Sequence, residues 1–222
     1  MNHSEEFIAA VSAGETARVS QFIDESPSVL GAVDGNGVGA ILTAIYHGHA
    51  PLGRLLAERG APVGFFEACA LGDLEAVRGM FAGDRSLLAR HSIDGFAPIG
   101  FATFFGHPEV DRLLLDAGVD IHQQSSNAMR VGAVHAAAAV CDHDMMELFL
   151  SRGANPNARQ QMEYTPLHTA AGRGDVRMAT LLLNHGADRE AAGSDGKTPA
   201  DVAREHGYGT FAEWLASYQP EA

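Results

Sequence analysis

A short segment of this chain recurs at intervals of 33 residues, and this period limits the possible folds more than any other feature. Thr165-Pro166 is followed 33 residues later by Thr198-Pro199, and Gly174 is followed at the same interval by Gly207. A fixed period of roughly 20 to 50 residues is typical of repeat proteins, in which each repeat buries its apolar face only against its neighbours. The period therefore predicts one array of stacked repeats.

The recurring segment is most complete at residues 165–170, which read Thr-Pro-Leu-His-Thr-Ala. A threonine can cap a helix, and a proline fits the first helical position, where its missing N–H is not needed. Leu167 and Ala170 are three positions apart and would share one helix face. This motif, at a period of 33, resembles the ankyrin-repeat family. The resemblance implies an all-α solenoid of helix-turn-helix repeats with short hairpin loops, and a non-catalytic module that binds a partner protein in its concave groove.

The residue between the two helices of each repeat, here called the turn position, gives a reference point along the chain. It is occupied in order by Gly14, Gly48, Gly72, Gly106, Cys141, Gly174 and Gly207. Seven turn positions predict seven helix pairs in a single ankyrin-repeat domain, residues 1–222. The interval between the second and third is only 24, because Ala61–Gly64 leads into the next helix without a hairpin. We therefore expect two sub-arrays, residues 1–63 and 64–218, and a short tail at 219–222.

Charge and cysteine usage narrow the class of partner. Lys and Arg number 15 against 28 Asp and Glu, a formal net charge of −13. An acidic surface repels phosphate groups, so we expect no nucleic acid and no membrane as partner. The first residues lack the basic and apolar regions of a signal peptide, and no run of about 18 apolar residues could span a membrane. Cys69 and Cys141 lie two repeats apart, too far for a disulfide, which indicates a reducing compartment. We expect a monomeric, cytoplasmic protein with an unidentified protein partner.

No catalytic or metal-binding pattern has useful spacing. The motifs G-x-S-x-G, Walker A, G-x-G-x-x-G and H-E-x-x-H are absent from the sequence, so we expect no enzyme and no cofactor. His135 and His168 stand at the motif histidine position, where we expect half-buried imidazoles that bond the backbone. Cys141–Asp144 contains metal-ligand residue types. Adjacent residues in a turn rarely converge on one ion, however, and we interpret this segment as a solvated turn.

The two residues before each turn position carry the binding hypothesis, because the resemblance implies that they face the groove. Interface hot spots favour central aromatic side chains and arginine inside a polar rim. At these positions and at the hairpin tips, the candidate partner-binding residues are Tyr46, His47, Leu71, Phe96, Phe104, Phe105, Met129, Arg130, Tyr164 and Arg173. For Phe104 and Phe105, burial in the core is an equally good interpretation, since phenylalanine is commonly buried.

Two other classes of function stay open. One is a small-ligand or metal-binding ankyrin protein that uses His47, His143 or the groove aromatics. The other is an enzyme with an unrecognised site. An enzyme would need a nucleophile and a base in contact, and the sequence does not assemble such a pair.

Overall fold

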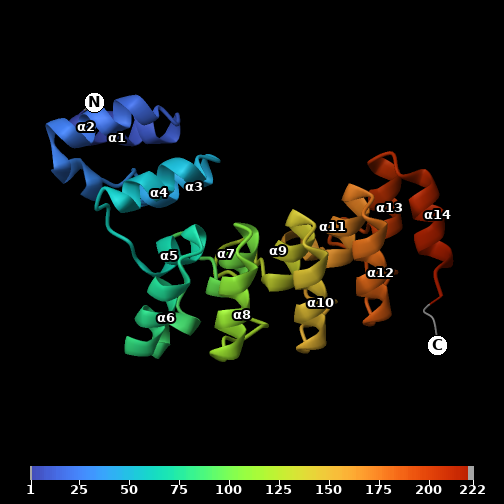
Figure 1. The fold of residues 1–222 in the computed structure, drawn as a ribbon. Coiled ribbons are helices and arrows are strands. Elements are labelled where there is room, and N and C mark those ends of the chain that lie inside the picture. Colours follow the sequence, from blue (N-terminus) through green and yellow to red (C-terminus); the bar gives the residue numbers. More distant parts are fainter. Residues whose placement is uncertain (1, 220–222) are drawn as a thin grey trace. The chain divides into compact units, whose positions relative to one another are not determined.

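Within residues 2–219, the chain forms fourteen α-helices in seven consecutive helix pairs, or repeats 1–7 (Figure 1). The structure is a computed structural model and describes residues 2–219. The helices are α1 His3–Ser12, α2 Thr16–Glu25, α3 Ala40–Tyr46, α4 Ala50–Glu58, α5 Phe65–Leu71, α6 Leu74–Gly83, α7 Pro98–Phe104, α8 Pro108–Asp116, α9 Ala133–Val140, α10 His143–Ser151, α11 Pro166–Arg173, α12 Val176–Asn184, α13 Pro199–Glu205 and α14 Gly209–Ser217. Short 3₁₀ helices are η1 Pro27–Gly31, η2 Arg85–Ala89 and η3 Gln161–Glu163. The prediction of an all-α fold with seven helix pairs is confirmed.

The chain divides into two compact units, Met1–Leu87 and Leu88–Ala222, here called the N-terminal unit and the C-terminal unit. The first holds repeats 1–3 and the second holds repeats 4–7. Residues 61–64, between α4 and α5, form neither helix nor bridge, so α4 leads into α5 without a hairpin, as predicted. The expected boundary between residues 63 and 64 lies one repeat earlier than this division and stays a prediction. Residues 220–222 of the expected tail lie outside the described residues.

In each repeat the chain turns from the first helix to the second through a residue with left-handed backbone geometry at the turn position. Gly174 ends α11 with φ of 66°, and Cys141 ends α9 with φ of 57°. This region is open to glycine, whereas another residue type pays about 1–2 kcal/mol for it. Cys141 therefore occupies the turn position of repeat 5, as predicted, and does so against its steric preference.

The second helix of each repeat buries one apolar stripe. In α12 the buried side chains include Met178, Ala179 and Leu182, which stand at positions i, i+1 and i+4 and so share one face. Arg177, on the opposite side of the same helix, is exposed. This pattern fixes which side of the helix faces the core, because turning α12 by half a turn would expose the whole stripe.

Two buried histidines join repeats 5 and 6 to the connecting segments that follow them. His135 Nδ1 accepts from Gly132 N at 3.2 Å, and its Nε2 lies 3.0 Å from Ala158 O. His168 Nδ1 accepts from the backbone N–H of Thr165 at 3.0 Å. Because Nδ1 is an acceptor, the ring hydrogen is on Nε2, which donates to a carbonyl. The expectation that these imidazoles bond the backbone is confirmed, but both are fully buried, at 1% exposed, and not half-buried as expected.

The connecting segments of the C-terminal unit, which we call fingers, are also bonded to one another. The finger between α8 and α9 donates from Ser126 N to Gly95 O in the preceding finger, at 2.8 Å. Gln161 N donates to Met129 O and Ser194 N donates to Met162 O, both at 2.8 Å. One backbone hydrogen bond therefore connects each finger to the previous one.

Candidate functional site

The ten predicted binding residues are divided between the two units. Tyr46 and His47 at the end of α3, and Leu71 at the end of α5, belong to the N-terminal unit. Tyr46 is 37% exposed, and Leu71 is half-buried. His47 is exposed, with its Nδ1 2.8 Å from Thr43 O in its own helix. The other seven residues lie in the C-terminal unit, where their geometry can be compared directly.

Phe104 and Phe105 differ in environment although they are adjacent. Phe104, the last residue of α7, is 54% exposed. Phe105 is half-buried and lies edge-on against the buried Phe101, with ring centroids 5.0 Å apart. The rings of Phe104 and Phe105 are nearly perpendicular to each other, with centroids 5.3 Å apart. The two phenylalanines therefore separate into an exposed ring and a ring held by the core.

The exposed C-terminal ends of the first helices of repeats 4–6 form a surface that we call the first-helix surface, made of Phe104, Ala139, Val140, Gly172 and Arg173. These residues occupy equivalent places, one or two positions before the turn position, on helices that pack against one another in chain order. Val140 is 38% exposed and was not among the predicted residues. Its place before Cys141 was the signal that could have identified it.

Arg173 is exposed at the end of α11, and its hydrogen-bond acceptor is the sulfur of Cys141, 3.8 Å from Nη1. Nearby, His143 Nε2 lies 2.9 Å from Asp175 Oδ2, and Asp175 also accepts from Met178 N at the start of α12. Burial alone would raise the pKa of Asp175, but the hydrogen bonds from Met178 and His143 outweigh it and lower that pKa. The carboxylate thus caps a helix and holds His143.

The finger residues mostly have partners within the protein. Arg130 forms an ion pair with Glu163 and also donates to Gln160 O. Tyr164 donates its hydroxyl to Asp195 at 2.9 Å and stacks on His168, with centroids 4.5 Å apart. These contacts join consecutive fingers, so both side chains serve the fold.

Two other finger residues were also candidates. Met129 is exposed at the tip of its finger. Phe96 is half-buried and its ring lies 6.3 Å from that of Phe101. Of the four finger residues predicted to bind a partner, Met129 is the one that presents an apolar side chain to solvent.

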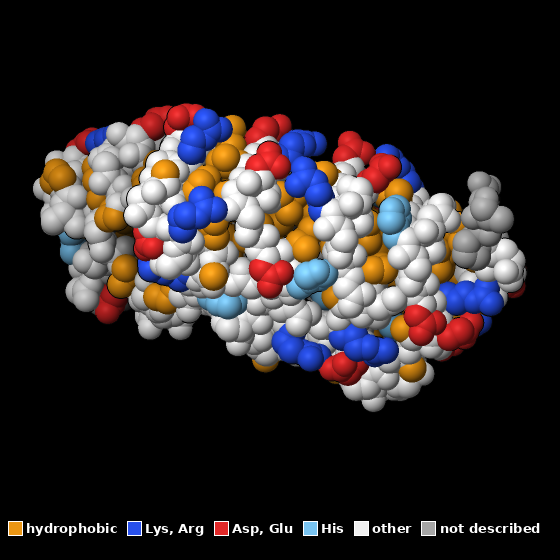
Figure 2. Space-filling view, turned by 90° about the horizontal axis from the view of Figure 1, so that it is seen from below, with side chains coloured by type: hydrophobic (Ala, Val, Ile, Leu, Met, Phe, Trp, Pro, Cys, Tyr) orange, Lys and Arg blue, Asp and Glu red, His pale blue; other side chains and the backbone are white. Residues whose placement is uncertain are grey.

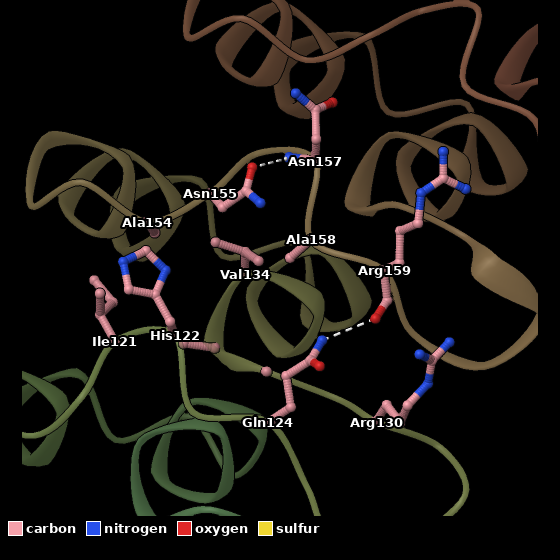
Figure 3. A pocket seen from close by; sticks show the side chains of 12 residues that line it. Ile121, His122, Gln124, Arg130, Val134, Ala154, Asn155, Asn157, Ala158 and Arg159 are labelled. Carbon is pink, nitrogen blue, oxygen red and sulfur yellow. Dashed lines mark hydrogen bonds between the residues drawn. The ribbon is translucent and has the colours of Figure 1, made fainter.

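A pocket of about 390 Å³ opens between the start of α9 and the adjoining fingers (Figure 3). Its polar groups are used within the chain. Gln124 Nε2 donates to Arg159 O at 2.8 Å, and Asn157 N donates to the side chain of Asn155. Arg159 Nη1 donates to the carbonyls of Glu163 and Ala192, both at 2.9 Å. These polar groups therefore fix the conformation of the fingers, and the pocket is the space left between them.

Asp111 is a buried carboxyl beneath the first-helix surface that sequence reasoning missed. It is 0% exposed, and its Oδ2 has no hydrogen-bond partner. Thr103 Oγ1 lies 3.1 Å from Asp111 Oδ1 and 2.7 Å from Ile99 O. Since a hydroxyl has one hydrogen, both contacts are satisfied when Asp111 is protonated and donates to Thr103. Burial, the largest influence, raises the pKa of Asp111 to about 8.

Alignment of the repeats could have revealed Asp111. Five residues after the turn position, the second helices of other repeats place buried residues such as Val19, Val77, Met146 and Ala179. Asp111 is the charged residue in this otherwise apolar column. A single sequence window around it, which reads Glu-Val-Asp-Arg-Leu, resembles an ordinary amphipathic helix and hides the anomaly.

Charge and metal chemistry do not single out another site. On the face that Figure 2 shows, acidic and basic side chains are interspersed with hydrophobic side chains between them. Within residues 2–219, no group of three or more His, Cys, Asp or Glu is arranged to hold a metal ion. Cys69 and Cys141 are both free thiols. In the same part of the chain, no helix is both long enough and apolar enough to cross a membrane.

Comparison with known proteins supports the repeat assignment in the C-terminal unit. Residues 134–222 match the family model described as ankyrin repeats, in three copies. Three copies correspond to the helix pairs α9/α10, α11/α12 and α13/α14. No curated protein matches the chain.

Proposed function

Because the chain belongs to the ankyrin-repeat family, we propose that it is a non-catalytic module that holds a partner protein on the first-helix surface of its C-terminal unit. Ankyrin repeats are generally protein–protein interaction modules. In the concave groove that the family resemblance implies, these helix ends face the partner.

The exposure of Phe104 is the observation that carries this proposal. A phenylalanine that is 54% exposed leaves much of its apolar ring in water, although the rest of α7 is buried. Such a ring is a typical anchor when a partner covers it, and truncation of a central anchor costs about 2 kcal/mol or more of binding free energy. Val140 extends the apolar area on the next repeat.

Two sets of titratable side chains in the C-terminal unit have structural roles, in keeping with a binding function without catalysis. Asp175 caps α12 and holds His143, and the imidazole of His168 accepts from Thr165. We further propose a monomer in a reducing compartment such as the cytoplasm, in keeping with the two free thiols.

The test is affinity capture from a cell extract with the full chain and two variants, followed by quantitative mass spectrometry. Phe104→Ala should keep its melting temperature within about 2 °C and lose the captured partner, because the exposed ring contributes little to folding. Phe105→Ala is the matched control. It should lose stability, by about 2 kcal/mol for a half-buried ring, and its folded fraction should still capture the partner. A partner that Phe104→Ala captures as well as the parent does would place the contact elsewhere on the protein.

A further inference from the structure

The first-helix surface presents two apolar side chains followed by a positive charge. Phe104 and Val140 are exposed apolar residues on α7 and α9, and Arg173 is exposed at the end of α11. The three helices follow one another in the C-terminal unit (Figure 1), and each packs against the next. Packed helices are spaced by roughly 10 Å, so each of these side chains lies about 10 Å from the next along the array.

Small residues accompany this row. Ala139 precedes Val140, and Gly172 precedes Arg173, and both are half-buried. A side chain of one carbon or none leaves room for a partner to approach the helix ends closely. The distance between packed helices is set by the side chains at their contact, so this part of the surface suits a close helix–helix approach.

The backbone of the surface favours a helical partner over an extended one. An extended peptide gains affinity by pairing its N–H and C=O groups with a free sheet edge. The first-helix surface is built from the ends of helices and not from a strand edge, so it lacks the alternating row of N–H and C=O groups that such an edge offers. A bound segment must therefore satisfy its own backbone, and a helix does so.

Arg173 differs from neighbouring arginines in its partner. Arg130 pairs with Glu163, and Arg177 pairs with Asp144. The acceptor of Arg173 is a thiol sulfur at 3.8 Å, and sulfur is a weak acceptor. Arginine forms its strongest hydrogen bonds with a carboxylate, often through two parallel N–H groups. The net charge of −13 opposes a generally acidic partner, which limits the expected match to a local carboxylate.

We propose that the occupant is an amphipathic helix of another protein, with apolar side chains against Phe104 and Val140 and one aspartate or glutamate against Arg173. A helix rises about 1.5 Å per residue, so a spacing of about 10 Å corresponds to about seven residues. The partner helix then carries apolar residues at i and i+7 and the carboxylate near i+14, read in the direction from α7 to α11. This proposal rests on the proposed function, since it specifies the chemistry of the partner at the same surface.

The test is a selection from a phage-displayed library of helical peptides, randomised along one face, against the full chain and against Arg173→Glu. The parent should enrich peptides with the apolar pair and an acidic residue at the third position. Arg173→Glu should enrich lysine or arginine at that position. A fluorescent peptide from the first selection should bind Arg173→Glu at least tenfold more weakly than it binds the parent, and Phe104→Ala should weaken it similarly.

Arg173→Gln provides a neutral variant in case a glutamate at the end of α11 disturbs folding, and circular dichroism checks both. Suppose that Phe104→Ala weakens the binding of the enriched peptides, but that both selections give the same residues at the third position. This result would overturn the proposed carboxylate contact with Arg173 and leave the proposed function standing. If Phe104→Ala weakens the binding of none of the enriched peptides, the proposed function is wrong as well.

Discussion

The two units use different side chains at the same place in the repeat, six residues before the turn position. In the N-terminal unit these side chains are apolar and buried, namely Ile8, Leu42 and Phe66. In repeats 5 and 6 of the C-terminal unit they are His135 and His168, which are equally buried. One helix-pair fold is therefore stabilised by apolar burial in one unit and by directed hydrogen bonds in the other.

The difference shows what the histidines add. An apolar side chain contributes through the area it removes from water and makes no directional demand. His135 and His168 bond their own helix start and reach a carbonyl in the following finger, Ala158 O and Lys197 O. The match to ankyrin repeats begins at residue 134, where these histidines appear. The N-terminal unit thus forms the same kind of helix pair with apolar side chains at this position.

The largest expected effect is a contrast between the two buried side chains. Phe66→Ala should lower the free energy of unfolding by about 3–5 kcal/mol, because a buried ring is lost. His168→Ala should lower it by about 1–3 kcal/mol, because the hydrogen-bonded backbone groups lose their partner. Denaturant unfolding measures both, and hydrogen exchange should locate the first loss in the N-terminal unit and the second in the C-terminal unit. A His168→Ala chain with unchanged stability would contradict the buried role.

Of these two substitutions, only His168→Ala should change stability by an amount that depends on pH. Burial lowers the pKa of His168 below its ordinary value of 6.5. The folded chain therefore keeps this ring neutral, while the unfolded chain takes up a proton as the pH falls below about 6.5. The stability that His168 contributes is present above that pH and is lost below it, so parent and His168→Ala should converge in acid. The loss in the free energy of unfolding caused by Phe66→Ala should stay constant between pH 5 and 8. A pH-dependent loss for Phe66→Ala and a constant one for His168→Ala would contradict the distinction between the units.

A second prediction places an opposite pH effect in the C-terminal unit. Burial raises the pKa of Asp111 from its ordinary value of 3.8 to about 8. Between these two pH values the folded chain keeps a proton on Asp111 that the unfolded chain has lost. Stability should therefore fall as the pH rises through this window, up to about 8. At about 1.4 kcal/mol per pH unit, the loss between pH 6.5 and 8 is about 2 kcal/mol.

Asp111→Asn should abolish most of that slope, and thermal melts of parent and variant across this range measure it. The range above pH 6.5 is chosen because His135, whose burial lowers its pKa to about 4, acts in the opposite direction at lower pH. Equal slopes for parent and variant would mean that Asp111 is ionised in the folded chain.

The smallest expected effect concerns the turn position within the C-terminal unit. Cys141→Gly should stabilise the chain by about 1 kcal/mol, because φ of 57° suits glycine. The reverse exchange, Gly174→Cys, should destabilise it by more, since a Cβ there would come within 2.7 Å of the Tyr208 ring. Melting temperatures of the two variants give the comparison, and a loss of stability in Cys141→Gly would show that the thiol contacts outweigh the strain.

The sequence alone predicts the repeats well, because a period of 33 residues is repeated evidence for one local structure. Even Cys141 could be placed correctly at a turn position normally held by glycine. Phe104 and Phe105 could not be separated, since one residue along a helix is a rotation of 100° and the period does not fix where each ring points. Arg130 and Tyr164 were predicted to bind a partner because the sequence does not show that their side chains are already bonded. Their partners, Glu163 and Asp195, lie in the next finger, about one period away.

The two cysteines give the protein a selective chemical handle. Cys69 is 0% exposed, whereas Cys141 is half-buried and borders Arg173 on the first-helix surface. A maleimide dye should therefore attach to the native chain at one thiol, with no engineered cysteine and no prior removal of the other. Because that thiol is within 4 Å of a proposed contact residue, the emission of the dye would change when a partner displaces water there. Occupancy of the surface can thus be followed by fluorescence in an otherwise natural chain.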